Sequence, residues 1–191
     1  KVGKYKEPRG RIRFLSDDER KRLLDACKKS SNHLLYPIVV IALSTGARRG
    51  EILSLKWNHV DLRRNIIVLY KTKNEEVRTL PLVAHALEEV KKINKVRSID
   101  TDLLFPGRNR NQPIDIRVAW GKALEKAEIA DFRFHDLRHS AASYLAMNGA
   151  TLTEIADILG HKTLQMVKRY SHLTEQHTAK VVTKMNRQIF E

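Results

Sequence analysis

The sequence has one cysteine, no long apolar run and a shortage of acidic side chains, and each shortage excludes something. The only cysteine, Cys27, allows no intrachain disulfide, and its place in a helical pattern beside Ala26 predicts a small packing residue. The most apolar stretch, residues 34–43, contains Pro37 and falls well short of the about 18 residues that a membrane span needs. Because no signal-peptide pattern is present either, the expected location is the cytoplasm, without membrane attachment.

Acidic residues are outnumbered, with 22 Asp and Glu against 36 Lys and Arg, which gives a formal net charge of +14 over 191 residues. Such an excess is typical of proteins that bind polyanions. Nucleic acid is the leading partner, although basic proteins also bind membranes or acidic proteins. A content of 42% hydrophobic and 30% charged residues, with no biased tract, indicates a soluble globular chain. The length fits one domain with at most a short appendage.

The start of the chain differs from the rest. Residues 1–13 are rich in Lys, Arg, Gly and Pro and lack apolar periodicity. They are expected to be a linker that follows an upstream segment, and residues 14–191 are expected to form the folded domain.

The apolar patterns of the domain predict a mainly helical fold with one small sheet. Ser16 and Glu19 have the spacing of a capping box, and residues 34–44 are apolar on all sides, as in a buried helix. Helices are expected over residues 16–29, 34–44, a segment ending near Trp57, 83–95, 114–128, 135–148, 151–159, 163–169 and 174–189. Residues 66–68 and 77–82 predict two antiparallel strands joined by a polar loop. The expected fold class is α+β and predominantly helical, with a small antiparallel sheet (about residues 60–82) packed on a helical core.

One polar cluster lies in the pattern His135-Asp136-Leu137-Arg138-His139. Positions three apart on a helix project together, so His135 and Arg138 would place an imidazole and a guanidinium side by side. A guanidinium can donate two parallel hydrogen bonds to phosphate oxygens and keeps its charge at any working pH. Taken alone, the pair is equally consistent with the surface of an amphipathic helix.

Two further clusters lie earlier in the chain. Gly46 would turn the chain and place Arg48 at a helix N-terminus, which favours anions, with Glu51 near enough to hold that arginine by an ion pair. Lys71 and Lys73 lie in the loop between the predicted strands. There, an ammonium whose pKa is lowered by nearby arginines could deliver a proton, although hairpin lysines are usually only solvated.

The last cluster combines Leu159-Gly160-His161 with Arg169-Tyr170-Ser171-His172. A phenol with a pKa near 10 is a poor nucleophile at neutral pH, but cationic and imidazole neighbours favour its deprotonation. A lone tyrosine is most often a packing residue, so the cluster gains meaning only with the others.

Together these clusters resemble the tyrosine recombinase (phage integrase) family. The patterns Thr-Gly-x-Arg-x-x-Glu, a hairpin Lys ahead of Arg78-x-x-Pro81-Leu82, His-x-Leu-Arg-His, Leu-Gly-His and Arg-Tyr-x-His occur in the family's order and at its intervals. The resemblance implies an integrase-type catalytic domain over residues 14–191. It also implies that residues 1–13 are the linker from a missing N-terminal DNA-binding domain.

The resemblance implies a role for each motif residue in the breaking and rejoining of DNA. Arg48 and Arg138 would clamp the non-bridging oxygens of the scissile phosphate, and His161 would hydrogen-bond the same group. Tyr170 would form a 3′-phosphotyrosyl link, with His135 as the acid–base group at the nucleophile. A 5′ hydroxyl of another strand would then attack that link, so that no ATP, metal or other cofactor is needed.

The remaining candidates support this set. Lys73 would protonate the departing 5′ oxygen. Lys71 lies on the same loop, but the interval to the Arg-x-x-Pro-Leu pattern favours Lys73. Glu51 and His139 would support the arginine and His135, respectively. Additional DNA contacts are expected from Arg11, Arg13, Lys71, Arg78 and Arg169.

The partner implied is double-stranded DNA, in the cytoplasm at the nucleoid, for a protein encoded by a bacterium, phage or mobile element. The helix expected over residues 174–189 has Ala179, Val182, Met185 and Ile189 on one stripe. We expect this stripe to dock on a neighbouring protomer and to support a tetramer on DNA. The alternative is that it packs on its own core.

Three other hypotheses compete with this one. His135 and His139, four apart on a helix, resemble paired ligands of zinc hydrolases with His161 as a third, but Asp136 stands where such enzymes have glutamate. A DNA-binding module without catalysis would not need a tyrosine beside a histidine. Type IB topoisomerases share the tyrosine chemistry, but the Leu-Gly-His and Arg-Tyr-x-His patterns resemble integrases. The sequence specifies neither the DNA target nor the choice among integration, excision and resolution.

Overall fold

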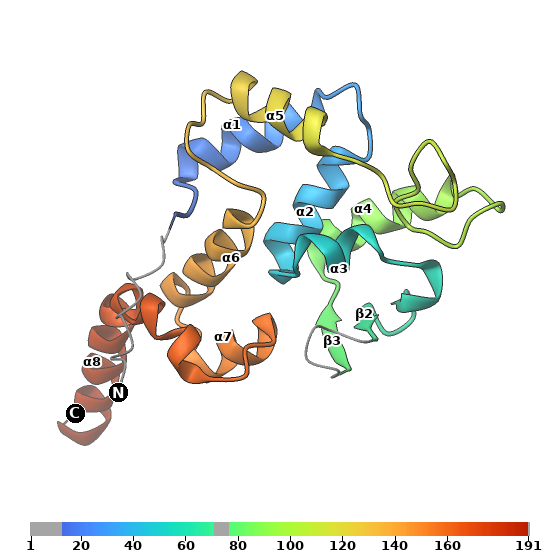
Figure 1. Ribbon diagram of the computed structural model, residues 1–191. Coiled ribbons are helices and arrows are strands. Elements are labelled where there is room, and N and C mark those ends of the chain that lie inside the picture. The colour runs from blue at the N-terminus through green and yellow to red at the C-terminus, as the bar shows by residue number, and fades with distance from the viewer. Residues whose placement is uncertain (1–12, 71–76, 191) are drawn as a thin grey trace, which may run out of the picture.

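The computed structural model describes residues 13–70 and 77–190 as a mainly helical domain with one small sheet (Figure 1). The α-helices are α1 (Asp17–Lys28), α2 (Leu35–Thr45), α3 (Arg49–Leu53), α4 (Ala84–Lys95), α5 (Arg117–Lys126), α6 (Asp136–Met147), α7 (Leu152–Leu159) and α8 (Glu175–Phe190). The 3₁₀ helices are η1 (Trp57–His59), η2 (Leu164–Met166) and η3 (Lys168–Thr174), and the strands are β1 (Val60–Asp61), β2 (Ile66–Leu69) and β3 (Arg78–Pro81). The predicted fold class is confirmed.

The start of α1 and the burial of α2 follow the sequence signals. The Ser16 hydroxyl accepts a hydrogen bond from the Glu19 N–H at 3.2 Å, and the Glu19 carboxylate accepts one from the Ser16 N–H at 2.9 Å. Helix α2 is apolar nearly all round because α1, α4 and α6 pack around it. These helices form the main hydrophobic core.

The sheet has three antiparallel strands in the order β1-β2-β3, one more strand than expected. Ile67 of β2 lies opposite both Val60 and Leu80, while Leu69 lies opposite Arg78 at the other end of the β2–β3 pair. Ile67, Leu69 and Leu80 are buried, in keeping with the period-two alternation of a half-covered sheet. The polar loop predicted between β2 and β3 falls at residues 71–76, which lie outside the described residues.

The helix expected to end near Trp57 ends instead at Leu53. The backbone beyond it is taken by a distant segment: the Trp57 N–H donates to the Asp102 carbonyl at 2.8 Å, and the Leu104 N–H donates to the Leu55 carbonyl at 2.7 Å. Leu55 is buried as its apolar pattern indicated, but through this strand-like pairing and not through a helix.

The helix expected over residues 163–169 was also wrong in type, since this part forms the 3₁₀ helices η2 and η3. Val167 and Tyr170 are both buried and lie three residues apart, which matches the three-residue turn of a 3₁₀ helix. With α6 and α7, these side chains form a second, smaller hydrophobic cluster. Tyr170 is therefore held in place by packing against α6 and α7.

Helix α8 projects away from the body of the domain at the C-terminal end of the chain (Figure 1). The predicted stripe is solvent-facing: Val182 and Met185 are each 47% exposed and Ile189 is 60% exposed. The alternative in which this stripe packs on the core of its own chain is therefore not what the structure has.

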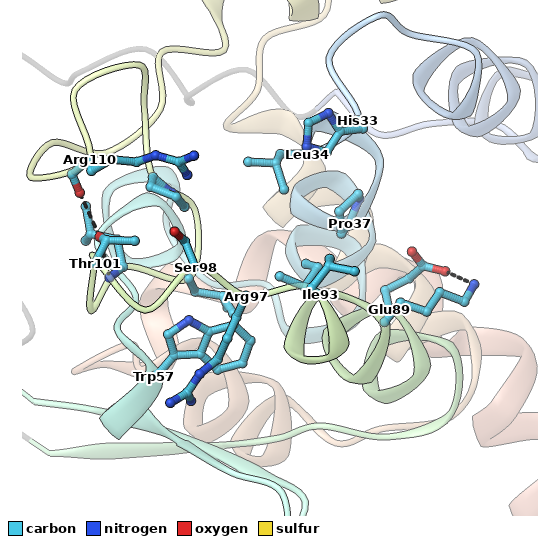
Figure 2. A pocket seen from close by; sticks show the side chains of 15 residues that line it. His33, Leu34, Pro37, Trp57, Glu89, Ile93, Arg97, Ser98, Thr101 and Arg110 are labelled. Atoms are coloured by element: carbon cyan, nitrogen blue, oxygen red, sulfur yellow. Dashed lines mark hydrogen bonds and ion pairs between the residues drawn. The ribbon is translucent and has the colours of Figure 1, made fainter.

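A cavity of about 440 Å³ lies between α2, α4 and the segment that follows α4, apart from the motif residues (Figure 2). The Arg97 guanidinium carbon lies 5.3 Å from the centroid of the Trp57 ring in its wall. Across the two described ranges, none of the helices combines the length and the apolar character that crossing a bilayer would require.

Candidate active site

The site is built where the C-terminal ends of α2 and α7 meet. Each helix ends on a glycine in the left-handed region, Gly46 at φ 62° and Gly160 at φ 64°. The last carbonyls of a helix have no partner within it and carry the negative end of the helix dipole. Two such helix ends that face one point therefore form a favourable binding site for a cation.

Arg138 occupies that site. Its Nη1 donates to the Gly46 carbonyl at 2.7 Å and its Nη2 donates to the Leu159 carbonyl at 2.6 Å, while the residue is only 4% exposed. Burial lowers the pKa of Arg138 to about 10, and the charges of Arg48 and Arg78 act in the same direction. The two carbonyl bonds use two of the five guanidinium donors, which leaves others for a ligand.

Glu51 holds two further arginines. Its Oε1 accepts from Arg48 Nη1 at 2.7 Å and its Oε2 accepts from Arg78 Nη2 at 2.8 Å. Oε2 also accepts from the Arg48 backbone N–H at 2.7 Å, which fixes the first turn of α3. The predicted ion pair between Arg48 and Glu51 at a helix N-terminus is thus present.

The sequence treated Arg78 as a candidate DNA contact, but the structure places it in the interior of the site. Its side chain is 10% exposed, and Nη1 donates to the same Leu159 carbonyl that Arg138 binds. Burial lowers the pKa of Arg78, while Glu51 opposes that shift. Arg48, Arg78 and Arg138 consequently surround one carboxylate and one carbonyl.

Tyr170 is 1% exposed, and its hydroxyl shares a hydrogen bond of 2.5 Å with Nδ1 of His139. Burial raises the pKa of Tyr170, whereas the charges of Arg169 and Arg138 lower it. Burial, followed by the neighbouring His135, lowers the pKa of His139 to about 4, so its imidazole is neutral at pH 7. A neutral imidazole on a phenol is an arrangement that can accept the phenolic proton.

The other two histidines flank this pair. The His135 ring packs edge-on against the His139 ring at a centroid distance of 5.3 Å, and partial desolvation with the Arg138 charge lowers the pKa of His135. Burial, then Arg138 and Arg48, lowers the pKa of His161 to about 4. The buried Nδ1 of His161 has no hydrogen-bond partner among the described residues.

The remaining predicted residues divide into three groups. Lys73, Lys71 and Arg11 lie outside the described residues. Arg13 is bound to the Glu19 carboxylate and lies 5.3 Å from the Phe132 ring centroid, so its guanidinium is already engaged within the domain. Arg169 is exposed, and its charge acts on Tyr170 and on both neutral histidines.

Sequence reasoning ranked His139 as a supporting residue, yet among the described residues it is the histidine that contacts the Tyr170 hydroxyl. The signal lay in the motif itself, because His139 is one residue beyond Arg138 and one turn beyond His135. The bonds of Arg78 to Glu51 and Leu159 had no such signal, since the partners lie 27 and 81 residues away.

The left-handed glycine at the end of α2 allows a test of the frame. A Cβ at Gly46 would overlap Cδ2 of Leu159, and a left-handed backbone costs a non-glycine residue about 1–2 kcal/mol. Gly46→Ala is therefore expected to lower the free energy of unfolding by at least that amount in urea denaturation. Gly50→Ala is the matched control, because a Cβ there meets nothing within 4 Å. Equal stability of the two variants would contradict the close approach of Gly46 to Leu159.

The neutral histidines predict how stability depends on pH. The folded pKa values of His139 and His161 are about 4, below the ordinary 6.5, so the unfolded chain binds more protons between these values. The free energy of unfolding should therefore fall as the pH falls from 6.5 to about 4. Above this window both histidines are neutral in the folded and the unfolded chain, and their full contribution to stability is present. Urea denaturation at about pH 7.5 and about pH 5 measures the fall, which His139→Gln should make shallower. A wild-type stability that is flat over this range would refute the assignment.

The geometry combines a tyrosine on a neutral histidine with a cluster of arginines, and the chain belongs to the phage integrase family, whose sequence pattern it matches over residues 13–177. It is 34% identical to the integrase of Salmonella phage P22 over 87% of this chain and 45% of that protein. It is 37% identical to a shufflon-specific DNA recombinase of Escherichia coli over 90% of this chain and 43% of that protein. The chain thus spans less than half the length of these two relatives.

Solved structures agree with this assignment. The catalytic domain of the bacteriophage HP1 integrase superimposes with a TM-score of 0.70 at 30% identity, covering 91% of this chain and 95% of that one. A XerA recombinase superimposes with a TM-score of 0.75 at 29% identity, covering 96% of this chain and 67% of that one. The fold is therefore that of an integrase catalytic domain.

The zinc-hydrolase hypothesis requires a set of metal ligands. In the part of the chain that the structure describes, no three His, Cys, Asp or Glu side chains are grouped so that they could hold a metal ion. Nδ1 of His139 is bonded to the Tyr170 hydroxyl.

Proposed function

We propose that this chain is the catalytic domain of a tyrosine-type site-specific recombinase, which cleaves and rejoins DNA through Tyr170. The observation that carries the proposal is the hydrogen bond between the Tyr170 hydroxyl and His139. It lies beside the arginine cluster of Arg48, Arg78 and Arg138, which has an excess of positive charge. Arg48 and Arg78 repel Arg138, and Glu51 only partly opposes that repulsion. A bound phosphate would relieve it.

In the proposed reaction, Arg48 and Arg138 bind the non-bridging oxygens of the scissile phosphate and stabilise the charge of the pentacoordinate transition state. His161 hydrogen-bonds the same phosphate. Donors of this kind are worth about a hundred- to a thousandfold in rate each. Because Arg138 is held from two helix ends, it meets the phosphate without reorganising.

The covalent step forms a bond between the Tyr170 oxygen and phosphorus and breaks the bond from phosphorus to the 5′ oxygen. We assign acceptance of the phenolic proton to His139, which contacts the hydroxyl, with His135 as the acid–base group beside it. Lys73, or Lys71, protonates the 5′ oxygen. A 5′ hydroxyl of another strand reverses the step, and the energy of the phosphodiester is kept in the phosphotyrosyl bond.

The buried state of Tyr170 has a consequence for the order of events. At 1% exposure the hydroxyl does not reach a phosphate in solution, so η3 must shift before attack. The pKa of Tyr170, raised by burial, keeps the phenol protonated until then. DNA would thus meet the arginines first and the nucleophile afterwards.

The proposed partner is double-stranded DNA. Two solved proteins of this fold, a XerH recombinase and the Tn1549 integrase, are complexes with DNA, at TM-scores of 0.73 and 0.75. We further propose that residues 1–13 link this domain to an N-terminal DNA-binding domain, and that the exposed stripe of α8 docks on a neighbouring protomer in a tetramer. The protein would act in the cytoplasm of a bacterial cell, on chromosomal, phage or mobile-element DNA.

The test uses nicked duplexes taken from the DNA that flanks the gene, incubated with the protein in excess chelator. A nick lets the cleaved strand diffuse away, so the covalent intermediate accumulates and migrates as a slower band on a denaturing gel. The proposal predicts a DNA-linked band in chelator. Cleavage that leaves no protein on the DNA, or that requires added metal, would refute it.

A further inference from the structure

We infer that Arg78 is a positioning residue for the phosphate-binding arginines and not a DNA ligand: it holds Glu51 against Arg48 and shares the Leu159 carbonyl with Arg138. This inference rests on the proposed function, since it assigns Arg78 a part in the same cleavage step. It differs from the expectation, drawn from the sequence, that Arg78 contacts DNA directly.

Arg78 is locked between two elements. Its Nη2 lies 2.8 Å from Glu51 Oε2, which ties β3 to α3, and its Nη1 donates to the Leu159 carbonyl, which ties β3 to the end of α7. The side chain lies across the turn at Gly160, where a Cβ would come within 2.5 Å of Nη1 and 2.9 Å of Cδ of Arg78. The left-handed glycine thus leaves the space that this guanidinium occupies.

Arg78 differs from Arg48 in its burial and in its protein contacts. Its side chain is 10% exposed, against 27% for Arg48, and both terminal nitrogens already donate to protein acceptors. The buried Nε has no partner within the described ranges, so the guanidinium is held at its tip. The protein contacts of Arg78 thus hold its two terminal nitrogens on Glu51 and Leu159.

The charge arrangement explains why an arginine is needed here. Glu51 alone would neutralise Arg48, because the two side chains form a one-to-one ion pair at 2.7 Å. With Arg78 on the second carboxylate oxygen, the three groups carry a net charge of +1 and Arg48 keeps its attraction for phosphate. Arg78 therefore fixes the direction of Arg48 and preserves the positive potential of the site.

Arg78 also stands at the end of the sheet from which the lysine loop departs. It lies opposite Leu69 at the last pair of the β2–β3 register, and residues 70–77 connect the two strands. The bonds of Arg78 to Glu51 and Leu159 therefore fix the position of β3 relative to Arg48 and Arg138. The effect of removing it should therefore fall on the cleavage step.

The experiment compares Arg78→Met with wild type on the nicked duplex, with separate measurement of DNA affinity and of the cleavage rate at saturating protein. We expect the saturated rate to fall roughly 10- to 100-fold, as for a small misplacement of catalytic groups, with Kd changed by less than about threefold. Arg64→Met, in the exposed turn before β2, removes the same charge and should leave the saturated rate unchanged.

Coupling to Glu51 provides a readout that loss of packing would not give. If Arg78 acts through Glu51, the effects of Arg78→Met and Glu51→Gln on the saturated rate should not multiply in the double variant, because both changes break the same chain of contacts. Arg78→Lys, which can reach one acceptor but not both, should recover part of the rate. It also decides the matter if Arg78→Met does not fold.

Three results would overturn the inference: a wild-type saturated rate in Arg78→Met, a loss confined to DNA affinity with a shallower salt dependence, or multiplicative effects of the Arg78 and Glu51 changes. Failure of the proposed function is distinguishable, because wild type itself would then form no covalent adduct. A wild type that forms the adduct beside an unimpaired Arg78→Met refutes only the role of Arg78.

Discussion

Tyr170→Phe is expected to abolish the covalent protein–DNA adduct while leaving DNA affinity within about twofold, because only the attacking oxygen is removed. The aromatic ring still fills its place beside Val167 in the second cluster. Loss of the 2.5 Å hydrogen bond leaves His139 Nδ1 unpaired, which should lower the free energy of unfolding by about 1–3 kcal/mol. The measurements are adduct yield on a denaturing gel and Kd by mobility shift.

Tyr144→Phe is the matched control for this change. Its hydroxyl also makes a hydrogen bond, to Asp17 at 2.9 Å, but that partner is the first residue of α1 and not a histidine or arginine of the site. It should lose less stability, because the exposed Asp17 carboxylate can bond to water instead, and it should keep full adduct formation. An adduct in Tyr170→Phe, or its loss in Tyr144→Phe, would contradict the assignment of the nucleophile.

Arg138→Lys should lower the cleavage rate by about a hundred- to a thousandfold, although it keeps the positive charge. The planar fork of Arg138 spans the Gly46 and Leu159 carbonyls, and an ammonium cannot satisfy both and still present donors to phosphate. A carbonyl left unpaired in the interior costs about 1–3 kcal/mol, so the free energy of unfolding should fall as well. Single-turnover cleavage and urea denaturation measure the two effects.

The chain offers a control with the same local chemistry. Arg22 donates from Nη1 to the carbonyl of Ala127 at the end of α5, but lies on α1, and its side chain is 38% exposed. Arg22→Lys should therefore leave cleavage unchanged and alter stability only slightly. If Arg138→Lys cleaved as well as Arg22→Lys, bidentate anchoring would not matter to the reaction.

Local signals allowed much of the fold to be predicted. The capping boxes at Ser16 and Thr151 mark the starts of α1 and α7, and Gly46 ends α2, because each depends on residues within one turn. The helices expected at 83–95 and 135–148 are found as α4 and α6 with nearly the same limits. Periodicity, caps and turns are written in neighbouring residues and can be read there.

The errors arise where distant segments decide the local structure. Helix α3 ends early because residues 55–57 bond with residues 102–104, and no neighbour of Leu55 announces that pairing. Val167, just before η3, and Tyr170 within it lie three residues apart and are both buried, which matches a 3₁₀ turn. These outcomes depend on the assembled core, which a one-dimensional pattern does not contain.

The same distinction applies to the site. The pairing of Arg48 with Glu51 was predictable because the two residues are three apart on one helix turn. The binding of Arg138 to Gly46, 92 residues away, and to Leu159 was not, since backbone carbonyls leave no mark in a sequence. The resemblance to integrases predicted the residue set, whereas the structure is needed to see what holds these residues in place.

The most direct test of the account is to digest the trapped protein–DNA adduct and to locate the attached nucleotide by mass spectrometry. The account predicts one modified peptide, with a 3′-linked nucleotide on Tyr170. A nucleotide on Tyr36, Tyr70 or Tyr144, on a serine, or linked through its 5′ end would contradict it.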